Sequence, residues 1–336
     1  MKRVLGIVLA FMMVFAFTSC KGKEKKAGTS GDAKEVSVLG DVNGDGVFTV
    51  AYIAVTTTLA PYPIDILNQF QAYADKHEWE LEVYDGNGDV NTQTEQVASV
   101  ISDDIVDLVV LFPVDSAAAV TYVKDFSEAG IDVITITSDV KAEGQSMVYC
   151  YVGPDQKNGL VGPGANYILE HFKAGSNYVI LSGWEAQYDY IVREASVNEF
   201  FTDAGYNQLA VKYCGASRDT AYEEMSALLV ANKDIDFVFA LSDEFALGGV
   251  QAIKEAGYKP GDITVVSLEA FIDSMEQVKD GWIQLTVTQT GTDLMTKLAE
   301  VIYSWMAKDS IDYVQLSTGT TITADNAAEW ETKLPY

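Results

Sequence analysis

Histidine and cysteine are scarce in this chain: its 336 residues include only two histidines and three cysteines. His77 and His171 lie near no cysteine and no cluster of carboxylates, which disfavours a zinc centre or a histidine-based catalytic triad. No Walker motif, nucleophile elbow or HExxH sequence is present. We therefore predict no catalytic residue, no metal ligand and no cofactor. The spacing of Cys150 and Cys214 leaves open whether these two residues form a disulfide.

Basic residues are also few. Lysine and arginine total 22 against 49 aspartates and glutamates, which gives a formal net charge of −27 at pH 7. A surface this acidic repels phosphate backbones, so nucleic acid is not expected as a partner.

A long apolar run occurs only at the N-terminus. The basic start Met1-Lys2-Arg3 precedes an apolar stretch that is too short for a comfortable membrane span, as in a secretory signal peptide over residues 1–20. Thr18-Ser19-Cys20 resembles a bacterial lipobox, in which Cys20 would become the lipidated first residue; an uncleaved anchor is the alternative. Residues 21–47 are rich in Lys, Gly, Ser and Asp, and predict a flexible tether.

The tether ends in Asp41-Val42-Asn43-Gly44-Asp45-Gly46, which resembles the start of an EF-hand loop. Position twelve of such a loop would be Tyr52, where a bidentate carboxylate is needed. We interpret the segment as a solvated turn without a metal.

Beyond the tether, buried strands alternate with amphipathic helices, which indicates parallel α/β sheets. The pattern runs through once to about residue 136 and then begins a second pass, so we predict two similar lobes. The predicted strands are 48–56, 81–84, 105–112, 131–136, 178–181, 209–213, 237–241, 263–266 and 285–288.

Residues 237–253 hold the strongest local signal. An apolar run that suits a strand buried on both faces stops at Ser242-Asp243-Glu244, which has the chemistry of a helix N-terminus. A helical pattern then resumes with Phe245 and Leu247. Polar side chains thus stand at the carboxyl end of a buried strand, where open α/β sheets bind ligands, although a helix cap alone would explain them.

Val238-Phe239-Ala240-Leu241-Ser242-Asp243-Glu244-Phe245-Ala246-Leu247-Gly248 is similar to a V-F-A-x-N-D-x-x-A-x-G segment of the type I periplasmic binding proteins, in particular the ribose/galactose type of ABC transporters. Phe112-Pro113-Val114-Asp115-Ser116, and Arg193 followed by Gly205, resemble further parts of that family in the same order. The resemblance implies two Rossmann-like lobes with parallel sheets joined by a three-stranded hinge. The implied lobes are residues 48–154 plus 290–318 and residues 155–289 plus 319–336.

The resemblance also implies a ligand site between the lobes. Planar charged or amide groups would bind hydroxyls, and aromatic rings would cover C–H faces. The residues at the matching positions are Tyr62, Trp184, Arg193, Ser242, Asp243, Glu269 and Gln289. Thr137-Ser138-Asp139 departs from the Asp-Arg of the ribose type, and Ser242 replaces an Asn, so the ligand need not be ribose.

Three of the predicted site residues also have a purely structural explanation. Arg193 can form a helix-surface ion pair with Glu194 or Asp189, Asp243 can simply cap its helix, and Trp184 can pack between the lobes.

Together with the lipobox-like Thr18-Ser19-Cys20, the resemblance implies an extracytoplasmic, lipid-anchored solute-binding protein, and the lack of an acid/base or nucleophile constellation disfavours an enzyme. It would capture a small polar molecule, a sugar in the ribose/galactose type, and deliver it to the permease subunits of an ABC importer. A receptor that presents its ligand to a sensor kinase or chemoreceptor shares every pocket feature and stays open as the alternative.

Overall fold

The computed structural model describes residues 38–335 except 233 and 318. The predicted signal peptide, the lipidation site Cys20 and most of the predicted tether lie outside the described residues. Within the described part, no helix combines the length and the apolar character needed to cross a membrane.

The first lobe is built on a six-stranded, wholly parallel sheet with strand order β11-β5-β4-β3-β1-β2. Its inner strands are continuous apolar runs, because both faces of a parallel sheet are covered by helices. The strands are β1 (Thr49–Ala54), β2 (Glu80–Asp85), β3 (Leu108–Leu111), β4 (Asp132–Ile136), β5 (Cys150–Pro154) and β11 (Val314–Ser317).

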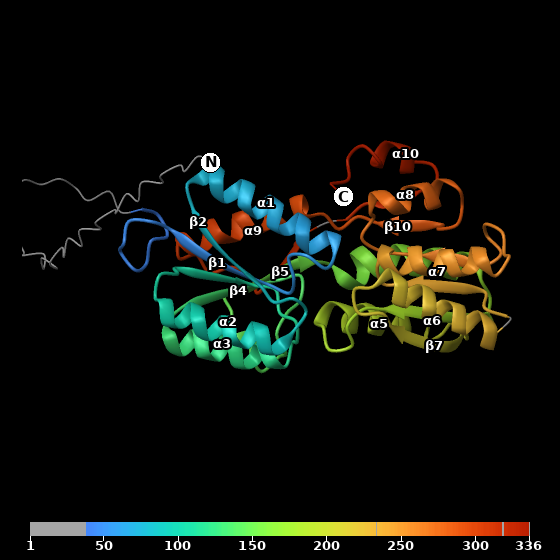
Figure 1. The fold of residues 1–336 in the computed structure, drawn as a ribbon, viewed down its shortest axis with the longest axis horizontal. Coiled ribbons are helices and arrows are strands. Elements are labelled where there is room, and N and C mark those ends of the chain that lie inside the picture. Colours follow the sequence, from blue (N-terminus) through green and yellow to red (C-terminus); the bar gives the residue numbers. More distant parts are fainter. Residues whose placement is uncertain (1–37, 233, 318, 336) are drawn as a thin grey trace, which may run out of the picture. The chain divides into compact units, whose positions relative to one another are not determined.

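Two pairs of helices cover this sheet. Figure 1 shows α1 (Pro61–His77) and α9 (Gly291–Met306) on one face, and α2 (Val90–Asp103) and α3 (Ala118–Ala129) on the other. Each pair has its own apolar cluster, one around Phe70 and the other around Phe126. A short 3-10 turn (Gln145–Met147) leads into β5.

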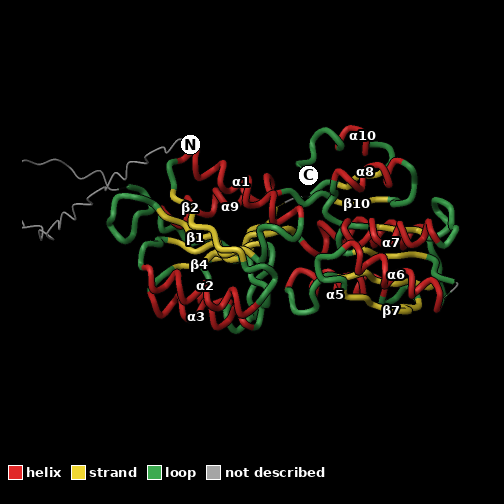
Figure 2. The backbone as a smooth tube through the Cα atoms, in the orientation of Figure 1, coloured by secondary structure: helices red, strands yellow, loops and turns green. Residues whose placement is uncertain are grey.

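The second lobe repeats the plan with strand order β12-β10-β9-β8-β6-β7. All neighbouring strands are parallel except β10 and β12, and β12 is the edge strand that pairs antiparallel with β10. Figure 2 shows the strands of each sheet side by side between helices. The strands are β6 (Asn177–Ser182), β7 (Asn207–Tyr213), β8 (Phe237–Ala240), β9 (Thr264–Val266), β10 (Leu285–Val287) and β12 (Thr321–Thr323).

Helices cover both faces of the second sheet as well. Phe201 of α5 contacts Phe237 and Phe239 on one face, and Gly249 of α7 lies against Leu181 on the other. The helices are α4 (Gly162–His171), which follows a π-helical turn (Gln156–Val161), α5 (Tyr188–Phe201), α6 (Arg218–Ala231), α7 (Asp243–Glu255), α8 (Ile272–Lys279) and α10 (Ala327–Trp330). The α/β class with two parallel-sheet lobes, predicted from the alternating pattern, is therefore confirmed.

The chain passes between the two sheets three times: after β5, after β10 and after β11. The last two connections are hydrogen-bonded to each other, from Thr288 N to Thr320 O (2.9 Å) and from Thr320 N to Thr288 Oγ1 (2.8 Å). A Cβ on Gly319 would lie 2.5 Å from the Thr288 carbonyl oxygen, so only glycine fits at this crossing.

Two local predictions differ from the structure. The last residues of the predicted tether are fixed to the first lobe, because Val42 N and Asn43 N donate to Asp107 Oδ1 at 2.7 and 3.1 Å. The sequence pattern also predicts a helix over about 193–204 with a loop before it, whereas α5 begins at Tyr188, so Tyr188 and Tyr190 belong to the first turn of the helix.

The two remaining cysteines lie in different lobes. Cys150 is in β5 and Cys214 follows β7, and both are free, buried thiols. Burial raises the pKa of each thiol to about 12, which keeps both protonated and unreactive at neutral pH. The open question of a disulfide between them is thus answered in the negative for this structure.

Candidate functional site

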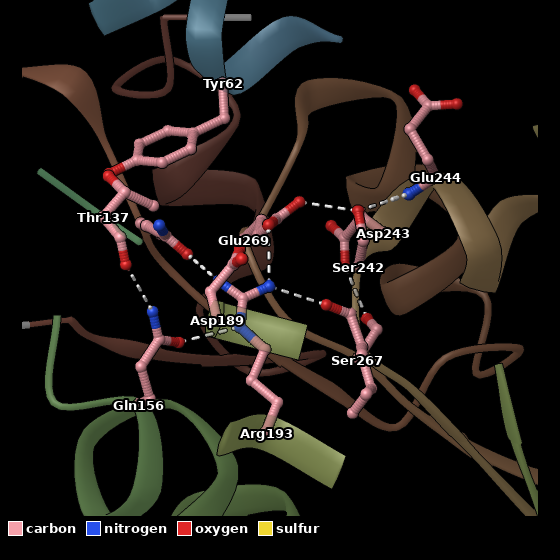
Figure 3. Close-up of polar contacts among 12 residues, drawn as sticks. Tyr62, Thr137, Gln156, Asp189, Arg193, Ser242, Asp243, Glu244, Ser267 and Glu269 are labelled. Atoms are coloured by element: carbon pink, nitrogen blue, oxygen red, sulfur yellow. Dashed lines mark hydrogen bonds and ion pairs between the residues drawn. The ribbon is translucent and has the colours of Figure 1, made fainter. Parts of the chain in front are cut away.

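Polar side chains from both lobes converge near the carboxyl ends of the second sheet. Ser242 follows β8, Glu269 follows β9 and Gln289 follows β10, while Arg193 reaches the same place from α5. Tyr62 comes from the first turn of α1 in the other lobe. Figure 3 shows the Arg193 guanidinium between Gln156 and Glu269, with the Tyr62 ring directed toward Thr137.

Arg193 is fully buried and binds protein groups with every nitrogen of its guanidinium. Nε donates to Gln156 Oε1 (2.8 Å), and Nη1 donates to the Leu241 carbonyl (2.8 Å) and to Glu269 Oε1 (2.9 Å). Nη2 donates to Gln289 Oε1 (2.6 Å). This network is what permits a buried charge, since an unpaired guanidinium could not stay in the interior.

Glu269 connects Arg193 to the start of α7. Its second oxygen, Oε2, accepts from Ser242 Oγ (2.6 Å), and Ser242 in turn is the N-cap of α7. Burial raises the pKa of the Glu269 carboxyl above its ordinary value, although Arg193 opposes the rise. The backbone of Glu269 has φ of 93°, and Thr137 in the first lobe has φ of 60°. Residues with such strained backbone conformations cluster at active sites and ligand-binding sites.

Asp243 is directed into the second lobe. Its carboxylate accepts from Ser267 Oγ (2.5 Å), Thr286 Oγ1 (2.8 Å) and Phe271 N (2.8 Å), and also from the Ser274 hydroxyl. Ser267 directly follows β9, Thr286 lies within β10, and Phe271 and Ser274 are at the start of α8. In this structure the residue therefore ties three elements together and is not in the wall of the cavity described next.

A cavity with a free volume of about 30 Å³ lies between the lobes. Its lining from the first lobe includes Tyr62 and Phe112, and polar, aromatic and small residues of the second lobe complete it. The second-lobe lining is Trp184, Gln187, Asp189, Tyr190, Ala216, Ser242, Glu244, Phe245, Glu269 and Phe271.

The predicted site residues divide into two groups. Four of them line this cavity: Tyr62, Trp184, Ser242 and Glu269. The other three, Arg193, Asp243 and Gln289, are buried behind the lining and hydrogen-bond to protein groups.

Sequence reasoning missed the contacts that join the lobes. Ser138 Oγ of the first lobe donates to Asp189 Oδ1 (2.8 Å), and Gln187 Nε2 donates to Ser138 Oγ (3.3 Å). Gln156 Nε2 also reaches across to the Thr137 carbonyl (3.3 Å). Asp189 lies in the first turn of α5, where a carboxylate is favoured by the helix dipole. A carboxylate at the start of a helix is the sequence feature that could have indicated Asp189.

Trp184 also spans the two lobes. It packs against the apolar clusters of both, and its ring lies close to Gly88 and, on the other side, to Gly215. Gly88 has φ of 66°, which favours glycine, and a Cβ there would lie at ordinary contact distance from the indole and from Leu59. The ring thus covers one side of the cavity.

Three comparisons with known proteins agree with this geometry. The family described as periplasmic binding protein domain matches residues 50–309. The ribose import binding protein RbsB of Bacillus subtilis is 27% identical over 303 residues, which cover 89% of this chain and 91% of the relative.

Solved structures are similar in fold. A galactofuranose binding protein superposes with a TM-score of 0.79 and 22% identity, covering 86% of this chain and all of the other. A solute binding protein from Actinobacillus succinogenes with bound D-allose has a TM-score of 0.74 and 22% identity, with coverage of 84% and 99%. The family match, the two-lobed parallel sheets and the position of the cavity together show that this chain belongs to the periplasmic binding protein family, with the type I fold.

Proposed function

We propose that this protein captures a small polar molecule, a sugar or sugar-like compound, between its lobes and delivers it to an ABC importer. The observation that carries the proposal is the cavity whose walls come from both lobes and combine aromatic rings with carboxylate, amide and hydroxyl groups. Carbohydrate ligands need this combination, because rings cover their C–H faces while polar groups bind their hydroxyls. The ribose and D-allose in the names of the similar proteins support the same ligand class.

Binding would couple to movement of the lobes. A volume of about 30 Å³ accommodates a water molecule or two, far below the several hundred Å³ of a typical small-molecule site. A monosaccharide therefore requires the lobes to separate from the arrangement described here. Ligand contacts made by both lobes then stabilise a closed form, which is a shift of population between two states.

The proposed roles follow the geometry. Tyr62 and Trp184 would contact the ligand with their rings, and Ser242 and Glu269 would bind its hydroxyls. Arg193 and Gln289 would hold Glu269 and the cavity wall in place, and Asp243 would fix the strand ends behind them. The ligand would leave chemically unchanged, so the proposed function is not enzymatic.

A thermal-shift screen of neutral monosaccharides, followed by titration calorimetry, tests this function. Tyr62→Ala and Glu269→Gln should each weaken binding of a positive ligand by about tenfold or more, since a lost charge-assisted bond or ring contact is worth about 1–3 kcal/mol. Glu143→Gln, an exposed carboxylate of the first lobe, is the matched control and should bind as the parent does. Unchanged affinity in both cavity variants would contradict the proposed site.

We also propose that Cys20 carries a lipid that anchors the protein outside the cytoplasm. The support is the signal-peptide pattern and the Thr18-Ser19-Cys20 context. Cys20→Ser should abolish labelling by a radioactive fatty acid and release the protein from membranes on fractionation. A variant that stays labelled and membrane-bound would overturn the anchoring proposal without affecting the ligand site.

A further inference from the structure

The lining of the cavity is rich in hydrogen-bond acceptors and contains no basic side chain. Among the described residues that line it, three carry carboxylates (Asp189, Glu244 and Glu269), and Arg, Lys and His do not occur. The hydroxyl of Ser242 is committed to Glu269. The charged side chains of the lining are therefore all acidic.

The carboxylates are unequally neutralised. Glu244 is paired with Arg218, which binds both of its oxygens at 3.0 and 2.9 Å and also donates to the exposed Asp273 (3.2 Å). Glu269 and Asp189 share a single guanidinium: Arg193 Nη1 is 2.9 Å from Glu269 Oε1, whereas Nη2 is 4.0 Å from Asp189 Oδ2. This shared site carries one more negative than positive formal charge, and only the start of α5 and the Ser138 hydroxyl add partial compensation at Asp189.

Gln187 gives an independent indication of a ligand. Its side chain lines the cavity and is only 2% exposed, and its Oε1 has no hydrogen-bond partner, while its Nε2 donates to Ser138. A buried carbonyl oxygen without a donor costs about 1–3 kcal/mol, so such an atom in a binding cavity points to a donor on the ligand.

Aromatic rings form much of the remaining wall. Tyr62, Trp184, Tyr190 and Phe245 all line the cavity, and the Tyr190 ring already lies 5.4 Å from the Arg193 guanidinium carbon. Ring faces carry partial negative charge and attract cations, most strongly where water is excluded. Rings and carboxylates around one cavity are thus complementary to a positively charged group.

We infer that the ligand carries a protonated amine, as an amino sugar or another amino-substituted polyol does, and that Asp189 selects for it. This inference rests on the proposed function and narrows its ligand class. The ammonium group would take the position next to Asp189 Oδ1 that the Ser138 hydroxyl now occupies, and would donate to the free Gln187 Oε1. Burial raises the pKa of the Asp189 carboxyl despite Arg193, in keeping with a negative charge that the chain itself does not fully compensate.

Matched sugar pairs test the inference directly. Titration calorimetry at about pH 6.5 would compare D-glucosamine with D-glucose and D-galactosamine with D-galactose, since an amine with a pKa near that of an α-amino group, about 7.7, is then protonated. N-acetyl-D-glucosamine serves as the uncharged derivative. In the wild-type protein at least one amino sugar should bind about tenfold or more tightly than its hydroxyl and acetylated counterparts.

Asp189→Asn isolates the charge, because asparagine keeps the size of the side chain and an oxygen that accepts from Ser138. The variant should lose the preference for the amino sugar while neutral sugars change by about twofold or less. Glu185→Gln, at an exposed carboxylate of the loop that precedes α5, is the control and should keep the preference. Circular dichroism would confirm folding, and the wild-type comparison stands even if a variant fails to fold.

The outcomes separate the inference from the function on which it rests. Neutral sugars that bind as tightly as their amino counterparts would overturn the amine inference and leave the sugar-binding proposal in place. A preference that survives in Asp189→Asn would overturn the role of Asp189. Failure of every sugar in the panel, neutral or amino, to bind would overturn both.

Discussion

Arg193 is the largest fully buried side chain among the described residues, and it holds four protein partners with one guanidinium. Truncating it would leave the Glu269 carboxylate buried without its cation. We expect Arg193→Ala to lower the free energy of unfolding by about 3–5 kcal/mol, measured by urea denaturation. Arg193→Lys should recover little, because an ammonium cannot form the same fork of bonds.

Arg218 provides the comparison for Arg193, since it also forms ion pairs but with a side chain that is 41% exposed. Solvent screens such pairs, so Arg218→Ala should cost about 1 kcal/mol or less. Equal losses in the two alanine variants would show that burial of the Arg193 network contributes no more than a surface ion pair.

The buried carboxyls of Asp189 and Glu269 should make the stability of the folded protein depend on pH. Burial is the largest cause of a raised pKa at both, so the folded state binds a proton more readily than the unfolded state. Their contribution to stability is present below the ordinary carboxyl pKa of about 4 and is lost as pH rises toward the raised folded value. We expect Asp189→Asn to lose less stability than the wild type over this window, in urea unfolding at about pH 4 to pH 7. Parallel pH profiles would contradict the assignment, because the other titrating groups are common to both proteins.

At the residue scale, the sequence indicated which side chains gather at the strand ends but not where each one points. Arg193, Ser242, Glu269 and Gln289 do meet in one network. The neighbouring Asp243 turns the other way, because hydroxyls supplied by Ser267, Ser274 and Thr286 surround it there. Those partners come from three other elements, and a linear pattern does not reveal them.

At the scale of elements, the transition from β8 to α7 was predictable because two independent signals coincide there. A fully buried apolar run ends where Ser242 supplies the N-cap, with Asp243 and Glu244 in the first turn. The start of α5 lacks such a signal, since Gln187 precedes it without a side-chain cap, and Asp189 was therefore overlooked as a site residue. Helix α8 leaves little apolar pattern in the sequence, because only two apolar side chains of its eight residues, Met275 and Val278, are buried.

The contacts of Asp243 predict that it stabilises the fold by joining helices and strands, and that it does not bind the ligand. Asp243→Ala would remove a carboxylate that accepts from three buried hydroxyls and from the Phe271 N–H, and we expect the free energy of unfolding to fall by at least about 2 kcal/mol, measured by urea denaturation. Asp243→Asn should lose less, since the amide oxygen still accepts. The affinity of the folded variants should change less than that of Glu269→Gln. If Asp243→Ala has a small effect on stability and a large effect on ligand affinity, Asp243 binds the ligand and the structural role is wrong.

At the scale of the whole molecule, alternation of strands and helices was enough to predict two parallel-sheet lobes, because each buried strand needs helices on both faces. The glycine at the last crossing was visible in the sequence, but the reason for it, the close approach of Gly319 to Thr288, is a long-range contact. The same holds for Ser138 with Asp189, which lie 51 residues apart and are brought together only when the lobes meet.

Those contacts between lobes predict that the free protein already favours the arrangement described here. Ser138→Ala removes the hydrogen bond to Asp189, and Trp184→Ala removes the ring that packs against both lobes. A hydrogen bond to a charged group contributes about 1.5–3 kcal/mol, so the ratio of closed to open molecules should fall about tenfold or more in the double variant. Small-angle X-ray scattering without ligand should then give a larger radius of gyration than for the wild type. Ser127→Ala, an exposed serine of α3, is the control and should scatter like the wild type. If the double variant keeps the wild-type radius, the contacts between Ser138, Trp184 and the opposite lobe do not set the closed state, and packing nearer the three connections would have to do so.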